Sequence, residues 1–70
     1  MPIHLANRNR KWIVTDLGGS REERSRLSDL GFIPGTPVYV VSCHPTALVI
    51  SVRGSRIMLN HSMARHIHVA

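Results

Sequence analysis

The sequence has 70 residues, of which 43% are hydrophobic and 19% are charged. It is long enough for one domain only, and too apolar for a disordered tail. Nine Lys and Arg against four Asp and Glu give a net charge of +5, which favours acidic or phosphate-bearing partners without naming one. A domain of this size has a thin core, which argues against a deep substrate pocket. We therefore expect one small domain over residues 1–70.

The composition also predicts where the protein works. A single cysteine, Cys43, cannot form an internal disulfide, which favours the reducing cytoplasm. The N-terminal stretch carries Arg8, Arg10 and Lys11 without an apolar stretch, so we expect no secretory signal. No apolar run exceeds that of Val38–Val41, far below the ~18 residues that span a bilayer. We expect a cytoplasmic protein that reaches the membrane only through a partner.

The first strand is predicted at Trp12–Thr15, where aromatic and β-branched residues precede the pair Gly18-Gly19. A helix should follow over about Arg21 to Leu30. Its start is indicated by a capping box, in which Ser20 accepts from the backbone of Glu23 and the Glu23 carboxylate accepts from the backbone of Ser20.

The helix should end at Gly31, which can take the left-handed conformation of a C-terminal cap. Pro34 prevents it from resuming. A helix this short is not stable alone in water. We therefore expect Leu27 and Leu30, three residues apart on one face, to be buried beneath it.

Strands and turns are expected from here to the end of the sequence. Pro34 and Gly35 suit the central positions of a type II turn. A strand is predicted at Pro37–Cys43 and another at Leu48–Val52, which alternates apolar with other side chains. Gly54-Ser55 then matches the central pair of a type II′ hairpin turn.

The last part of the sequence predicts three short elements. Residues 56–59 form the second arm of the hairpin, and Asn60 caps one helical turn that extends to Ala64. A final short strand should point Ile67 and Val69 inward and His66 and His68 outward. Five short strands leave costly edges in a flat sheet. The predicted fold is therefore mainly β: a small SH3-like or OB-like five-stranded barrel, with one short α-helix between the first and second strands.

Neither catalysis nor a cofactor is indicated by the sequence. Cys43 and His44 are adjacent, and adjacent residues of a strand point to opposite faces, so we expect no nucleophile and base pair. His66 and His68 could reach one metal ion, but a structural zinc site needs four ligands. His44, His61 and Cys43 could join them through folding. We expect a solvated histidine face, with no intrinsic metal site, and keep a metal-binding or metal-sensing domain as the third interpretation.

Nucleic-acid binding is the second interpretation. The net charge supports it, and small barrels often bind nucleic acids. Base stacking needs exposed aromatic side chains, however, and the sequence offers only Trp12, Phe32 and Tyr39. Phe32 is expected to close the helix cap and Tyr39 to belong to the barrel, which leaves Trp12 open.

The stretch Arg24 to Thr36, R-S-R-L-S-D-L-G-F-I-P-G-T, closely resembles a block of the FeoA family of ferrous iron transport accessory proteins. The likeness continues through residues 38–41, the hairpin of residues 52–57 and the terminal Ile67-His68-Val69. The resemblance implies an SH3-like barrel without enzymatic activity. It also implies a partner, FeoB, a membrane transporter of ferrous iron with a cytosolic GTP-binding domain.

We expect contact with FeoB through the helix and its exit. This predicted surface comprises Arg24, Arg26, Asp29, Phe32 and Ile33. Its arginine forks suit an acidic partner. The alternative is that Arg24 and Arg26 pair with Glu22, Glu23 or Asp29 of the same helix. Short edge strands can also pair between copies, which leaves a homo-oligomer open.

Overall fold

The computed structural model describes residues 1–70 as one five-stranded antiparallel sheet with three short helices. The strands and helices follow the chain in the order η1 (Ile3–Leu5, a 3-10 helix), β1 (Trp12–Leu17), α1 (Arg21–Asp29), β2 (Pro37–Cys43), β3 (Ala47–Val52), β4 (Ser55–Asn60), α2 (His61–Ala64) and β5 (Ile67–Val69). The mainly β class and the helix between the first two strands are confirmed.

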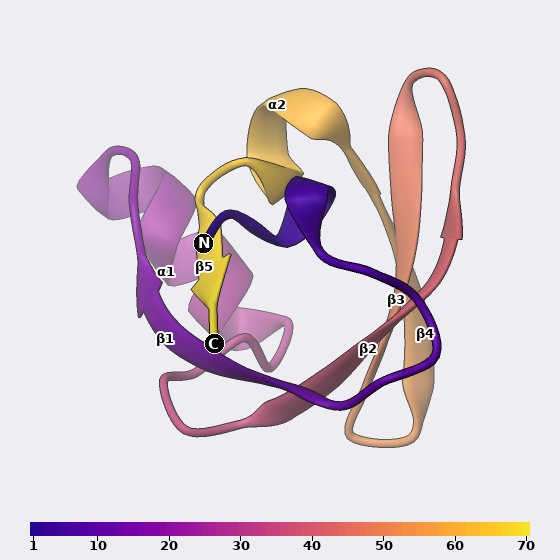
Figure 1. The fold of residues 1–70 in the computed structure, drawn as a ribbon. Coiled ribbons are helices and arrows are strands. Elements are labelled where there is room, and N and C mark those ends of the chain that lie inside the picture. The colour runs from indigo at the N-terminus through magenta and orange to yellow at the C-terminus, as the bar shows by residue number, and fades with distance from the viewer.

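The sheet is not closed into a barrel. Its strand order is β4-β3-β2-β1-β5, so β4 and β5 are its two ends and do not pair with each other. Figure 1 shows the sheet curving around the core, with α1 beside β1 and with α2 and η1 on the side between β5 and the β3–β4 hairpin. These two short helices contact the neighbouring strands and cover the core where strand pairing is missing.

The core consists of 14 buried hydrophobic residues, and every helix and strand contributes at least one of them. Val38 and Val40 of β2 point inward together with Leu48, Ile50 and Val52 of β3, as their alternation predicts. From the three helices and β5, Ile3, Leu27, Ala64 and Ile67 are fully buried. The apolar side chains whose burial stabilises this small domain therefore come from strands and helices that are distant in the sequence.

Of the two predicted turns, the first is confirmed and the second is corrected. The Ile33 carbonyl accepts from Thr36 N–H at 2.9 Å, and Gly35 has φ 93°, as a type II turn requires. The second turn lies at Arg53-Gly54 rather than Gly54-Ser55, because Val52 pairs with Ser55. Both central residues have positive φ, 51° and 80°, which makes the turn type I′ rather than II′.

The C-terminal elements match their prediction except at one histidine. Asn60 caps α2 by accepting from Met63 N–H at 2.9 Å, and Ile67 and Val69 are buried. His66, expected on a solvated face, precedes β5, and its side chain is only 14% exposed. It packs against the backbone of Gly19, close enough that a methyl group there would lie 3.1 Å from the ring.

Candidate functional site

The N-terminus of α1 is fixed by the predicted capping box. Ser20 Oγ accepts from Glu23 N–H at 3.1 Å, and Glu23 Oε1 accepts from Ser20 N–H at 2.8 Å. Two of the free N–H groups of the first turn are thereby satisfied. Arg24 also donates to the Gly19 carbonyl at 2.6 Å, which ties its guanidinium to the segment that enters the helix.

Glu23 joins this cap to the C-terminal part of the chain. Its second oxygen, Oε2, lies 3.3 Å from His66 Nε2, and this is the one close contact between a carboxylate and a basic side chain in the molecule. The Gly18 N–H donates to the His66 carbonyl at 2.7 Å, so backbone and side chain both hold the two segments together. Donation from Ser20 N–H and then from its hydroxyl lowers the pKa of the Glu23 carboxyl, with a smaller contribution from His66.

The lowered pKa predicts a pH-dependent effect of Glu23→Gln. The ionised carboxylate stabilises the fold above the ordinary pKa of glutamate, and this contribution is lost as pH falls through the lower folded-state pKa. We expect the variant to melt at a lower temperature than the wild type at neutral pH, and the difference to disappear in acid. Glu22→Gln removes the same charge from a side chain without a partner, so equal pH profiles for both variants would contradict this role of Glu23.

The C-terminal end of α1 is a Schellman motif. Gly31 has φ 108°, its N–H donates to the Ser28 carbonyl at 2.9 Å, and Phe32 N–H donates to the Leu27 carbonyl at 3.1 Å. Both Leu27 and Phe32 are fully buried. A positive φ of this size favours glycine, so Gly31 ends the helix as predicted.

Burial corrects two predictions made for this helix. Phe32 was expected on the partner surface, but it is fully buried and has no exposed area to offer a partner. Leu30 was expected beneath the helix, but it is 39% exposed. The reason is that Leu30 is the C-terminal cap residue, where the chain turns through Gly31 and carries Phe32 inward in its place.

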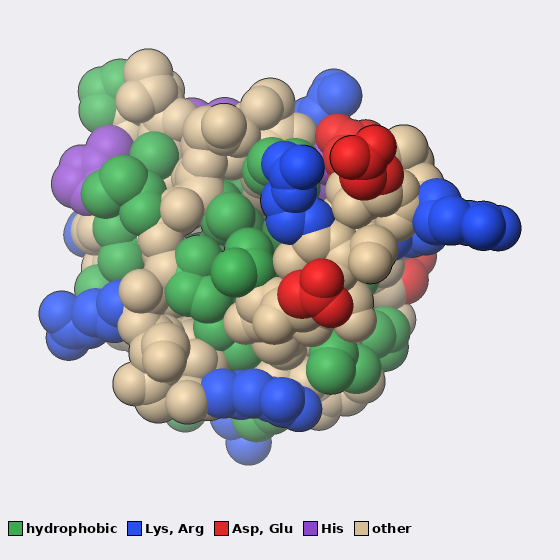
Figure 2. All heavy atoms as spheres, turned by 180° about the vertical axis from the view of Figure 1, so that it is seen from behind, with side chains coloured by type: hydrophobic (Ala, Val, Ile, Leu, Met, Phe, Trp, Pro, Cys, Tyr) green, Lys and Arg blue, Asp and Glu red, His purple; other side chains and the backbone are tan.

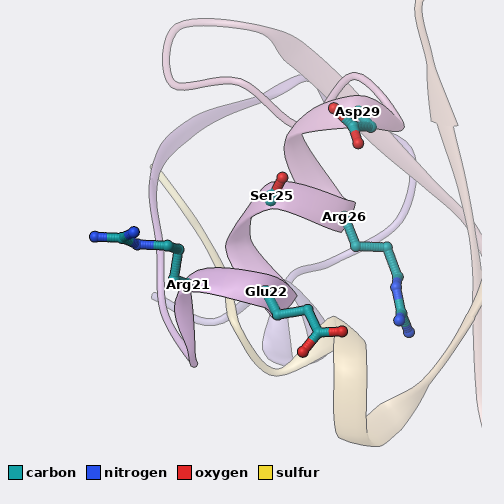
Figure 3. Close-up of a pocket in the computed structure, with 5 residues that line it drawn as sticks. All are labelled: Arg21, Glu22, Ser25, Arg26 and Asp29. Atoms are coloured by element: carbon teal, nitrogen blue, oxygen red, sulfur yellow. The ribbon is translucent and has the colours of Figure 1, made fainter.

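The exposed face of α1 carries a shallow hollow lined by five polar residues, all of them from this helix: Arg21, Glu22, Ser25, Arg26 and Asp29. Arg21 and Arg26 extend in opposite directions with Glu22 between them (Figure 3). None of these charged side chains forms an ion pair within the molecule. The predicted alternative, pairing within the helix, is therefore not what the structure shows.

A second hollow lies on another side of α1, against the end of β1 and the exit turn. It is lined by Asp16, Leu17, Arg21, Arg24, Ser25, Ser28 and Pro34. The predicted surface is thus divided: Arg26 and Asp29 line the first hollow and Arg24 lines the second. Ile33 is 39% exposed at the exit of the helix. Of the five residues predicted for this surface, only Phe32 is buried.

We give the name α1 surface to ten of the exposed or half-exposed residues of α1 and its exit: Arg21, Glu22, Arg24, Ser25, Arg26, Ser28, Asp29, Leu30, Ile33 and Pro34. On this side of the molecule basic and acidic side chains lie next to one another, with hydrophobic side chains beside them (Figure 2). Small-molecule sites are concave and mostly apolar. The mostly polar and shallow α1 surface does not have that form.

Arg21, Ser25 and Ser28 were not among the predicted site residues. Their sequence signal is weak, because serine and arginine are common on any solvated helix face. The helical spacing of Arg21, Ser25 and Ser28, four and then three residues, places them on one side and would have grouped them.

The histidines and the cysteine do not assemble into a metal site. No group of three or more His, Cys, Asp or Glu side chains lies close enough to hold an ion. His44 Nε2 instead contacts Ser42 Oγ at 2.9 Å, and His61 Nε2 donates to the His44 carbonyl at 2.8 Å. Cys43 is exposed.

The aromatic residues give little surface for stacking bases. Trp12 is 7% exposed, its ring lies under the Arg10 guanidinium at 3.9 Å, and its Nε1–H donates to the Asn7 carbonyl. Phe32 is buried, and only Tyr39, at 45%, is well exposed. No helix is long and apolar enough to cross a bilayer.

Comparison with known families gives one match over the whole chain: the family described as the FeoA domain, over residues 1–70. No curated protein matches the sequence. A crystal structure of an iron uptake regulatory protein, FeoA, superposes with a TM-score of 0.89 at 28% identity, covering 99% of this chain and 93% of that one.

Two other solved structures share the fold. Stenotrophomonas maltophilia FeoA in complex with zinc has a TM-score of 0.86 at 24% identity, covering 100% of this chain and 89% of that one. That protein is described as a prokaryotic SH3 domain protein and a candidate activating factor of bacterial ferrous iron transport. ScaR with bound Cd²⁺ has a TM-score of 0.87 at 17% identity, and the match covers 99% of this chain and 34% of that longer one.

Proposed function

The chain belongs to the FeoA family, and from this premise we propose that it is a non-enzymatic accessory protein of bacterial ferrous iron transport. It acts in the cytoplasm by binding the cytosolic part of FeoB, the transporter implied by the family, through the α1 surface. The description of the Stenotrophomonas maltophilia protein as a candidate activating factor of ferrous iron transport supports the link to transport.

The observation that carries the proposal is the set of unpaired charges on a rigid helix. The side chains of Arg26 and Asp29 are exposed and have no ion-pair or hydrogen-bond partner in the molecule. The capping box and the Schellman motif fix both ends of α1, and Leu27 anchors it in the core. A preorganised helix loses little conformational entropy on binding. Its arginine forks can pair with carboxylates of a partner in a bidentate geometry.

The proposal is tested by measuring the affinity for the isolated cytosolic domain of FeoB from the same organism. We expect Arg26→Glu to weaken binding about tenfold or more, since a hot-spot side chain contributes ~2 kcal/mol or more and each ~1.4 kcal/mol is a factor of ten in affinity. The fold of the variant is checked by circular dichroism. If the wild-type protein does not bind this domain, the proposal that FeoB is its partner is wrong.

Arg8→Glu is the matched control, because it makes the same charge change at an exposed residue outside the α1 surface. We expect it to change affinity only through the net charge, and mainly at low salt. An equal loss for Arg8→Glu and Arg26→Glu would mean that general charge rather than the α1 surface governs binding. Affinity that collapses with salt for both variants and for the wild type would favour a phosphate-bearing partner instead.

A further inference from the structure

The two ends of the sheet are protected to different degrees. At β5 the chain's own N-terminus adds to the edge: Val69 N–H donates to the Met1 carbonyl at 2.7 Å, and Pro2 bridges His68. At β4, no backbone hydrogen bond outside the β3–β4 pairing involves residues 55–59. Figure 1 places β4 on the opposite side of the molecule from β5 and the N-terminus. The β4 edge is therefore the open edge.

The hairpin register shows which backbone groups are free there. In a two-residue hairpin the closing pair, here Val52 and Ser55, exchanges both hydrogen bonds, and such pairs alternate along an antiparallel ladder. The pair Ile50 and Ile57 is then also hydrogen-bonded. The N–H and C=O groups of Arg56 and Met58 therefore point away from β3, at the spacing that an added strand requires.

The β4 edge lacks the usual protection against strand addition. Its pairing with β3 runs without a bulge over six residues, and it contains no proline. Met58 is 68% exposed, the highest value among the large hydrophobic residues that are exposed in this protein. Natural edges usually carry lysines, prolines or bulges instead. Arg56 is the one charged side chain of the strand.

The charge around the β4 edge selects the kind of segment. All four acidic residues of the chain precede Leu30, so every charged side chain in residues 30–70 is basic. Arg53 in the turn and Arg56 in the strand are both exposed. A second copy pairing through β4 would bring two positive edges together, which is unfavourable. An acidic segment would instead find its counter-charges in place.

We infer that the β4 edge binds an extended, acidic segment of a partner protein by strand addition. The backbone of the segment pairs with the backbone of Arg56 and Met58. Its side chains place a carboxylate beside Arg56 and an apolar group beside Met58. This site is separate from the α1 surface and does not rest on the function proposed for it. Arg26→Glu therefore leaves binding at the β4 edge unchanged.

The test uses ¹⁵N-labelled protein and two capped peptides, TETVTET and its basic twin TKTVTKT. We expect the acidic peptide to shift the amide signals of Arg56 and Met58 and to slow their hydrogen exchange. It should bind roughly fivefold tighter than the basic twin, as cross-strand charge pairs of ~0.2–1 kcal/mol each imply. Equal binding of the two peptides, or shifts confined to the α1 surface, would overturn the inference.

Two variants at one position separate backbone pairing from side-chain contact. Met58→Pro removes an N–H that makes no bond in the fold, so the hairpin should persist while peptide binding is lost. Met58→Ala keeps the N–H and should retain binding. Peptide binding by folded Met58→Pro contradicts strand addition. If that variant does not fold, amide protection in the wild type decides.

Two further outcomes identify a different occupant. Protection of Arg56 and Met58 that grows with protein concentration, without peptide, would show pairing between copies and overturn the inference. Amide signals of Arg56 and Met58 that respond to vesicles containing anionic phosphatidylglycerol, but not to the acidic peptide, would show that the edge binds a lipid surface. That result would also overturn the inference.

Discussion

Replacing Phe32 by alanine is expected to lower the free energy of unfolding by about 3–5 kcal/mol, the range for a large aromatic side chain removed from a core. Phe32 is fully buried and follows the helix stop at Gly31. A chain of 70 residues has a total stability of roughly 3.5 to 10 kcal/mol. The variant should therefore be largely unfolded or melt far below the wild type, as urea titration and circular dichroism would show.

Ile33→Ala is the matched control for Phe32→Ala. Ile33 is the next residue and is 39% exposed, so its truncation should change stability by only about 0.5 kcal/mol, as for most surface sites. If the two variants lose similar stability, the assignment of Phe32 to the core and Ile33 to the surface is wrong. Ile33→Ala folds on this expectation and can then be assayed for partner binding.

Much of the fold could be predicted because its local signals are strong. The capping box at Ser20, the stop at Gly31 and the turn at Pro34-Gly35 each depend on the chemistry of neighbouring residues. The type of the hairpin turn could not be read so directly. Arginine rarely takes positive φ, so the pair Arg53-Gly54 gives a weak signal for a type I′ turn, and Gly54 alone suggested another register.

Tertiary contacts explain what the sequence did not reveal. The i,i+3 spacing of Leu27 and Leu30 indicates one helix face, but the Schellman turn brings Phe32 into the core and leaves Leu30 half exposed. The contact of His66 with Glu23 joins residues 43 positions apart, which no local pattern can indicate. Barrel closure likewise depends on the distance between β4 and β5, and here short helices cover the gap.

Leu27→Ala tests whether the α1 surface depends on the packing beneath it. Leu27 is fully buried and is the only buried residue of α1, so its truncation should cost about 2–5 kcal/mol in the free energy of unfolding. Leu30→Ala removes the same atoms from a residue that is 39% exposed, and should cost less than about 1 kcal/mol. If urea titrations give equal losses in the free energy of unfolding for the two variants, Leu30 supports the helix as much as Leu27 does, as the helical spacing predicted.

The same pair of variants separates stability from recognition. Because Leu30 and Ile33 are both exposed near the exit of α1, Leu30→Ala can weaken partner binding while the fold persists. Leu27→Ala makes no direct contact with a partner, so its effect on binding should follow the fraction of folded protein alone. Binding lost by Leu27→Ala under conditions where it is fully folded would instead show that the packing beneath the helix sets the geometry of the α1 surface.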